Sequence, residues 1–300
     1  MNTQPQGAIV VGVAESVFKG WALRWAAEQA RLEGRPLTLV NASGPVSGAW
    51  REHGMDSLPT SSALLREHGQ QLLDRARAVV EEAAPDVQVH EVFDIVDPGT
   101  LLIQLSTTAH LLVLGSRGRG PVRSHLLGSV ALAVVRHAAC PVVVHRPDDH
   151  PGLVHRGVVV ATEATEDSRP VLAFAFRQAS LRGLPLHVVH YVYDVRAALV
   201  GTPMVGSLSE DVETHALALD GLVAGCRQDY PDVHVTVETL PGLLPEQGLV
   251  QLGREADLTV VGTHQRGVLS RMLAGSVSTS VLEHAVGPVA IVPTAVPTAS

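Results

Sequence analysis

The chain has 300 residues, of which 46% are hydrophobic, 17% are charged and only 3% are aromatic. This composition excludes intrinsic disorder as the main state, and the length favours two domains. The net charge of −8 argues against a nucleic-acid-binding protein that relies on a general basic field.

Single features disfavour several other classes of protein. No apolar run approaches the about 20 residues that a membrane helix needs, and Met1–Gly7 lacks the character of a signal peptide. Cys140 and Cys226 are too far apart for a disulfide scaffold or a cysteine-based zinc site. Lys19 is the only lysine and has no P-loop around it, which disfavours P-loop NTPases and Schiff-base enzymes. We expect a cytoplasmic protein without nucleic-acid or membrane partners.

Short apolar runs alternate with longer amphipathic stretches, which predicts alternating strands and helices. The first half should hold strands over Ala8–Val13, Leu37–Asn41, Val87–Phe93, His110–Gly115 and Pro141–His145, with helices over Gly20–Glu33, Ser61–Ala84, Gly99–Thr107 and Ser129–Ala138. The second half should hold strands over Gly157–Thr162, Leu186–Tyr191, His234–Thr239, Asp257–Gly262 and Pro288–Val292, with helices over Ser168–Arg182, Ser209–Gln228, Pro245–Arg254 and Ser276–His284. Strands without polar alternation are typical of parallel sheets buried on both faces.

The two halves of the chain repeat one pattern. Gly115–Gly120 matches Gly262–Gly267 at an offset of 147 residues (262 − 115), and Val10 matches Val159 at an offset of 149 (159 − 10). We therefore expect two domains, over residues 1–147 and 153–300. Each should be an α/β domain with a right-handed, doubly wound sheet of five parallel strands flanked by helices, a Rossmann-like architecture.

The segment after the fourth strand of the first copy is rich in glycine and arginine. It reads Gly115-x-x-Gly118, nine residues, then Gly128-Ser129, where a helix begins. In such sheets ligands bind beyond the carboxyl ends of the strands. Glycines there permit positive φ and close approach of the backbone, and the free N–H groups of a helix N-terminus attract phosphate. An isolated Gly-Ser pair is more often a simple helix cap. This pair follows a predicted sheet strand, and a matching Gly275-Ser276 pair occurs in the second copy, so we favour an anion site here. Three arginines add positive charge nearby: Arg117, Arg119 and Arg123.

This motif resembles the ATP-binding motif of the universal stress protein family. So do Ile9–Val13, Ala22–Ala26 in the first helix, and Cys140–Val144 at the end of the first copy. Because the resemblance covers both halves, the chain is similar to the tandem universal stress proteins common in actinobacteria. The resemblance implies a fold like that of the adenine nucleotide alpha hydrolases and an ATP ligand, with or without Mg²⁺. It also implies a regulatory role in the stress or dormancy response, in which the nucleotide is held rather than turned over.

Carried over by position, the resemblance assigns contacts with the nucleotide to both copies. In the family an Asp at the end of strand one holds adenosine, backbone of strand two contacts adenine, and the glycine loop holds ribose and phosphates. The matching residues are Val40, Gly115, Arg117, Gly118, Gly128, Ser129 and Val130 in the first copy, and Glu163, Gly262, Gly275, Ser276 and Val277 in the second.

Each copy departs from the family pattern in a different place. Ala14 stands where the family has Asp, and Glu15 where it usually has Gly. In the second copy Glu163 supplies a carboxylate, but Gln265 replaces the second glycine of the loop. We expect the first copy to be the better ATP site, because it keeps the phosphate cradle.

Two other interpretations stay open. A weak ATPase or phosphotransferase needs a base near the γ-phosphate, and His125 is the only nearby candidate in the loop. A scaffold that has lost its nucleotide is supported by Ala14 and Gln265. We assign no catalytic residue and no metal ligand, because the fifteen histidines include no H-E-x-x-H pattern.

Each copy ends in an apolar strand at an expected sheet edge, and exposed edges invite pairing. The resemblance implies that these last strands, Pro141–His145 and Pro288–Val292, pair antiparallel across a pseudo-twofold axis. We therefore expect an intrachain pseudo-dimer, with a homodimer of whole chains as a further alternative.

Overall fold

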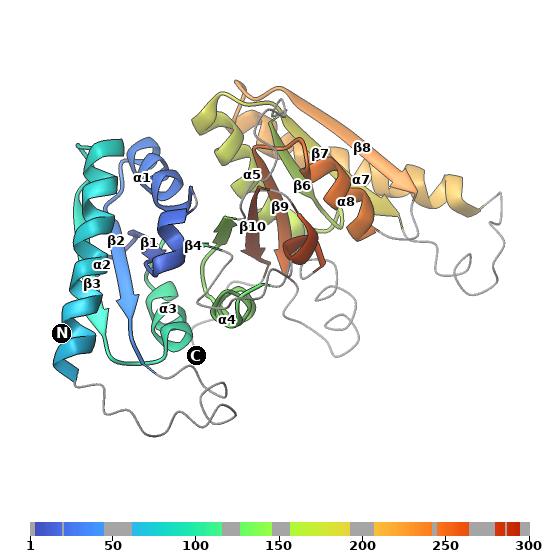
Figure 1. Ribbon diagram of the computed structural model, residues 1–300. Coiled ribbons are helices and arrows are strands. Elements are labelled where there is room, and N and C mark those ends of the chain that lie inside the picture. The colour runs from blue at the N-terminus through green and yellow to red at the C-terminus, as the bar shows by residue number, and fades with distance from the viewer. Residues whose placement is uncertain are drawn as a thin grey trace, which may run out of the picture. The chain divides into compact units, whose positions relative to one another are not determined.

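A computed structural model of the chain consists of two compact units, Met1–Pro147 and Asp148–Ser300 (Figure 1). The structure describes residues 4–19, 21–44, 62–115, 127–145, 157–192, 207–241, 245–263, 280–285 and 287–294. Within these ranges, no helix combines the length and the apolar character that crossing a membrane would require.

Unit 1 is a parallel sheet with the strand order β3-β2-β1-β4-β5. Its strands are β1 (Ile9–Gly12), β2 (Leu37–Ala42), β3 (Val89–Asp94), β4 (Leu111–Gly115) and β5 (Val142–His145). Its helices are α1 (Ala22–Glu33), α2 (Ser62–Ala83), α3 (Pro98–Ser106) and α4 (Ser129–His137), with a short 3₁₀ helix η1 (Glu15–Lys19) after β1.

Unit 2 repeats this arrangement with the order β10-β9-β6-β7-β8, again with parallel neighbours. Its strands are β6 (Val158–Ala161), β7 (Leu186–Val192), β8 (Val235–Pro241), β9 (Leu258–Thr263) and β10 (Pro288–Pro293). Its helices are α5 (Arg169–Arg182), α7 (Ser207–Asp229) and α8 (Pro245–Gly253), and a 3₁₀ helix η2 (Glu166–Ser168) follows β6.

The predicted fold class is confirmed. Every strand, and every α-helix whose bounds are given above, begins and ends within two residues of its predicted limits. Of the helix expected over Ser276–His284, residues 280–284 are helical and the others lie outside the described residues. The 3₁₀ helices were not predicted, because such short segments carry no hydrophobic period. The pairing of the two copies through their last strands stays a prediction.

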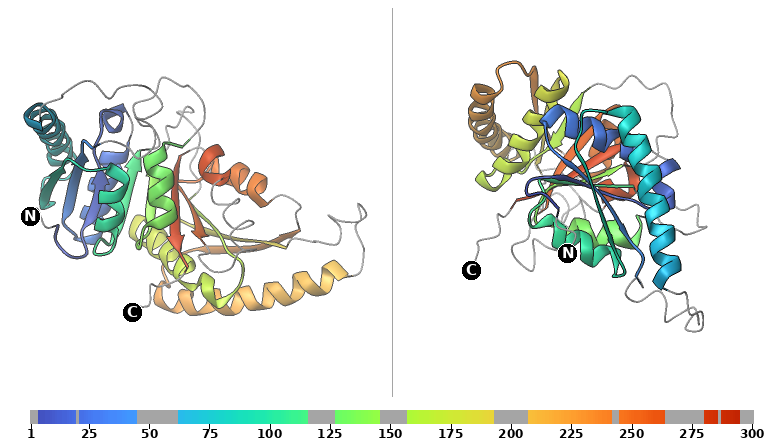
Figure 2. Two further views of the ribbon diagram at one scale, coloured as in Figure 1. Left: turned by 90° about the horizontal axis from the view of Figure 1, so that it is seen from below. Right: turned by 90° about the vertical axis from the view of Figure 1, so that its left-hand side faces the viewer.

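Helices cover both faces of each sheet (Figure 2). In unit 1, α1 packs against α2 and α3 packs against α4. The buried face of α1 shows why: Leu23, Ala26, Ala27 and Ala30 are spaced at the three- and four-residue intervals that place side chains on one side of a helix. The small alanines bring α1 close to the sheet.

The strand order decides where a ligand can bind. In unit 1, β1 lies at the centre with β2 on one side and β4 on the other. The connection after β1 leads to β2 on one side of β1, and the later connection from β3 leads to β4 on the other side. The carboxyl ends of β1 and β4 therefore form a topological switch point. In unit 2, β6 lies in the same way between β7 and β9.

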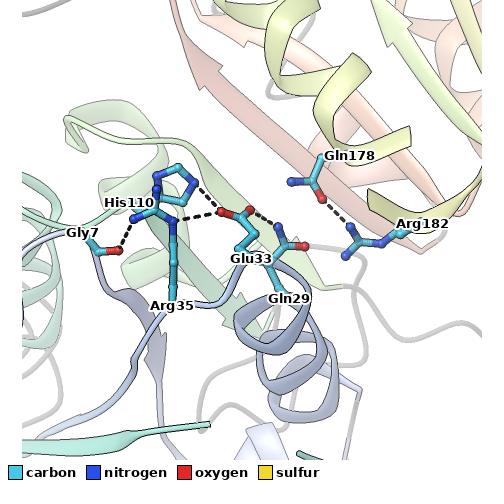
Figure 3. Close-up of polar contacts among 7 residues, drawn as sticks. All are labelled: Gly7, Gln29, Glu33, Arg35, His110, Gln178 and Arg182. Atoms are coloured by element: carbon cyan, nitrogen blue, oxygen red, sulfur yellow. Dashed lines mark hydrogen bonds and ion pairs between the residues drawn. The ribbon is translucent and has the colours of Figure 1, made fainter. Parts of the chain in front are cut away.

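At the amino ends of the strands of unit 1, opposite the switch point, a polar cluster surrounds Glu33 (Figure 3). The Glu33 carboxylate lies 2.8 Å from Nε2 of His110 and 3.1 Å from Nε of Arg35, and it accepts a hydrogen bond from Gln29. Nη1 of Arg35 donates to the carbonyl of Gly7 at 2.9 Å. The cluster thus joins the starts of β1 and β4 to the end of α1, and it lies away from the switch point. In unit 2 the matching positions differ, since Arg182 there donates to Gln178 at 2.6 Å.

Candidate functional site

The switch point of unit 1 is held together by bonds between β1 and β2. The N–H of Val13 donates to the carbonyl of Val40 at 2.7 Å, and Nδ2 of Asn41 donates to the carbonyl of Val13 at 2.8 Å. Because Asn41 is buried, this side-chain bond is shielded from water. The backbone directly before Ala14 is therefore fixed, and Ala14 is presented at the carboxyl edge of the sheet.

The end of β4 and the start of α4 form the other side of this edge. A Cβ atom added to Gly115 would meet no atom within 4 Å, so this strand end leaves open space among the described residues. Gly128 occupies the N-cap of α4, and among the described residues no side chain caps the helix there. The first N–H groups of α4, including those of Ser129 and Val130, have no intrahelical partner. Open space at the strand end, together with unpaired N–H groups at the helix start, can accommodate an anionic ligand.

The residue after Ala14 is engaged with α2. The carboxylate of Glu15 lies 3.3 Å from Nη1 of Arg75, and the Arg75 guanidinium also lies 4.2 Å from the centre of the Phe18 ring. Both charged side chains are about half exposed, so the ion pair contributes little to stability. The carboxylate nearest to Ala14 in the sequence is thus already paired with an arginine.

In unit 2 the matching segment carries a carboxylate on a strained backbone. Glu163 is exposed and follows Thr162 at the end of β6. The next residue, Ala164, has a φ of 56°, and among the described residues no other non-glycine residue has positive φ. Its N–H donates to Oγ1 of Thr162 at 3.2 Å. Ala164 therefore adopts a conformation that glycine, the residue usual here in the family, takes without cost.

The variant Ala164→Gly is expected to stabilise unit 2. Left-handed backbone costs an alanine about 1–2 kcal/mol, while the added freedom of glycine in the unfolded chain costs about 0.4–1 kcal/mol. The net gain should be about 0.5–1 kcal/mol, measured by urea denaturation. Ala161→Gly is the matched control, because Ala161 is a regular β6 residue and its loss should destabilise the strand. Equal losses from both variants would contradict strain at Ala164.

The structure places part of the predicted site and leaves the rest undescribed. Val40, Gly115, Gly128, Ser129 and Val130 lie at the carboxyl edge of unit 1, and Glu163 and Gly262 lie at that of unit 2. The loop residues lie outside the described residues: Arg117, Gly118, Arg119, Arg123, His125, Gln265, Gly275, Ser276 and Val277. The strand-end glycines Gly115 and Gly262 do not use the positive φ that glycine permits, because both continue their strands.

Sequence reasoning missed two features of the edge. Asn41 fixes the end of β1 through its bond to Val13, and His190 fixes the end of β6, since its Nδ1 lies 2.7 Å from the carbonyl oxygen of Thr162. Both were overlooked because a bond to a strand-end carbonyl depends on the register of two strands. One signal was available: the two residues hold the same place after the matching valines Val40 and Val189.

The repeat, the parallel sheets and the bare β4–α4 edge agree with one family. Residues 7–146 and 155–293 each match the model of the universal stress protein family. The chain belongs to that family.

Similarity to other universal stress proteins extends over nearly the whole chain. A universal stress protein of Mycobacterium tuberculosis is 34% identical over 294 residues, which are 94% of this chain and 95% of the relative. The crystal structure of a universal stress protein from Archaeoglobus fulgidus matches the fold with a TM-score of 0.67 at 19% identity, covering 95% of this chain and 96% of that one. A shorter A. fulgidus universal stress protein, solved in complex with dAMP, covers 47% of this chain and 98% of its own at 23% identity and a TM-score of 0.35.

Proposed function

We propose that this universal stress protein binds an adenine nucleotide, ATP with or without Mg²⁺, at the carboxyl edge of unit 1. In this proposal the nucleotide is held rather than hydrolysed, and the nucleotide-bound chain acts as a regulator in the stress response. One observation carries the proposal. At the carboxyl edge of unit 1, the described residues leave open space beside Gly115 at the end of β4, and they provide no side-chain cap for α4, which begins at Ser129.

The groups at this edge suit the parts of an adenine nucleotide. The N–H groups of Ser129 and Val130 have no partner among the described residues and can donate to phosphate oxygens, and the helix dipole favours negative charge there. The carbonyl of Val40 accepts one bond from Val13, and its second lone pair is available to the amino group of adenine. By sequence, Gly118 and the three loop arginines extend the same phosphate site.

The first test is the variant Gly118→Gln, which gives the first copy the loop residue of the second. If this glycine has the left-handed conformation for which the family motif uses it, a side chain costs about 1–2 kcal/mol, and ATP should bind about five- to thirtyfold more weakly. Isothermal titration calorimetry of the full chain measures the change. Gly221→Gln is the matched control, since Gly221 lies exposed in α7 with no atom within 4 Å of an added Cβ, and its ATP affinity should be unchanged.

Two outcomes would overturn parts of the proposal. Unaltered ATP affinity in Gly118→Gln would remove this glycine from the phosphate site. If the purified chain releases no adenine nucleotide on denaturation and shows no heat with ATP, the nucleotide role fails and the scaffold interpretation gains support.

A further inference from the structure

Unit 2 replaces the buried asparagine of the candidate site with a histidine. Asn41 of β2 and His190 of β7 occupy matching positions, because Leu37 pairs with Ile9 as Leu186 pairs with Val158. Nδ1 of His190 lies 2.7 Å from the carbonyl oxygen of Thr162. A carbonyl only accepts, so Nδ1 carries the proton and donates, as Nδ2 of Asn41 does in unit 1. The two units thus fix the same strand end with different chemistry, and only one of the two groups can titrate.

The surroundings of the His190 ring disfavour a second proton. With Nδ1 protonated, Nε2 holds a lone pair; it is buried, and no described residue bonds to it. The ring of His215 from α7 stacks on the His190 ring, with 5.0 Å between the ring centroids and an interplanar angle of 22°. Protonation would therefore place a second N–H in a buried position without an acceptor, which costs more than the same group in water.

The charged groups around His190 act in opposite directions. Burial lowers the pKa of His190 below its usual 6.5, and His215 lowers it further, while the carbonyl of Thr162 and the carboxylate of Glu163 raise it. On the neighbouring strand β8, the described acid Glu238 lies 3.2 Å from His187 instead. The neutral ring is the form that suits the folded site.

The bond from His190 reaches the residue that presents the candidate carboxylate. Thr162 directly precedes Glu163, and its hydroxyl also accepts the N–H of Ala164. A protonated ring would still donate from Nδ1 to Thr162, but its new N–H at Nε2 would be buried without a described acceptor. Protonation therefore favours conformations in which the ring has moved towards water, and in these the Thr162 carbonyl has lost its fixed donor. The backbone that orients Glu163 is then free to shift.

We propose that His190 is a positioning residue that makes nucleotide binding by unit 2 depend on pH, whereas unit 1, with Asn41, lacks this dependence. The inference rests on the proposed nucleotide-binding function of unit 1 and extends it to unit 2, where Glu163 supplies the carboxylate. Binding by unit 2 requires the neutral ring, so its affinity is constant above the native pKa and falls about tenfold for each pH unit below it. The matched variant is His190→Asn, which gives unit 2 the residue of unit 1.

The first experiment needs no nucleotide. NMR titration of histidine-labelled full chain should show the His190 ring titrating below 6.5, and its signal is identified by its absence from the spectrum of His190→Asn. The N–H of Thr162 donates to the carbonyl of Val189, and that of Ala164 donates to Oγ1 of Thr162. Amide exchange, corrected for intrinsic rate, should show both groups losing protection on acidification in the unaltered chain but not in His190→Asn. Should His190→Asn fail to fold, His215→Ala takes its place: uncovering the ring should move its titration towards 6.5 and shift the loss of protection with it. Equal protection at all pH values, or protection loss that ignores both variants, would overturn the inference.

The second experiment measures ATP binding between pH 7.5 and 5.0 by calorimetry. The parent chain carries Gln265→Gly, which restores the second glycine of the loop motif in unit 2. The control chain carries both Gln265→Gly and His190→Asn, and it shows how much of the pH dependence comes from the titration of ATP itself. The acid-induced loss of affinity at the second site should be at least tenfold larger in the chain that keeps His190 than in the chain that carries His190→Asn. Equal losses would overturn the inference. If neither chain binds ATP at any pH, the proposed function fails, while the NMR experiment still decides the role of His190.

Discussion

The variant Ala14→Asp should bind ATP about ten- to a hundredfold more tightly than the unaltered chain. A carboxylate at the end of β1 can accept hydrogen bonds from the ribose hydroxyls, and a well-aligned charge-assisted bond contributes about 1.5–3 kcal/mol. The position is prepared for it, because Val13 is fixed to both Val40 and Asn41. Glu15 does not already supply this group freely, since its carboxylate pairs with Arg75.

Calorimetry on two variants of the same position isolates the charge. Ala14→Asn has nearly the same shape as Ala14→Asp but no charge, so its gain in ATP affinity should be smaller. Gln265→Gly is the complementary change in unit 2, where Glu163 already supplies a carboxylate, and it should strengthen binding at that site. No gain from either Ala14→Asp or Gln265→Gly would count against a nucleotide role and favour the scaffold interpretation.

The variant Gly157→Ala should destabilise unit 2 by about 2–5 kcal/mol, the sum of backbone strain of about 1–2 kcal/mol and overpacking of about 1–3 kcal/mol. Gly157 has a φ of 105°, and an added Cβ would lie 2.3 Å from the carbonyl oxygen of Pro185. That oxygen accepts the N–H of Val158 at the start of β6. Moving it would disrupt the first bond between β6 and β7.

Gly183→Ala separates the two causes. Gly183 also has positive φ, 62°, but no atom lies within 4 Å of an added Cβ, so only strain remains and the loss should be about 1 kcal/mol. Far-UV circular dichroism during urea denaturation follows both units, while tryptophan fluorescence follows unit 1 alone, because Trp21, Trp25 and Trp50 are its tryptophans and unit 2 has none. Equal losses from the two variants, or a loss in the fluorescence transition, would contradict the predicted clash.

The sequence by itself determined the elements and their repetition. Uninterrupted apolar runs such as Leu111–Leu114 are a local signal, since a strand buried on both faces excludes polar residues wherever its partners lie. The spacing of Leu23, Ala26, Ala27 and Ala30 is equally local, because one helix face repeats every three or four residues. The matching glycine motifs, 147 residues apart, then indicated two copies and the edge of the sheet at which a ligand should bind.

Only the tertiary structure decided how the residues at that edge are held. The bond from His190 to Thr162 joins residues 28 positions apart, and the pairing of Glu15 with Arg75 joins residues 60 apart. Such contacts depend on strand register and on how a helix lies over its sheet, and neither leaves a period in the sequence. The left-handed backbone of Ala164 is likewise invisible there, because alanine is ordinarily a helix former and only the packing around the end of β6 holds it at positive φ.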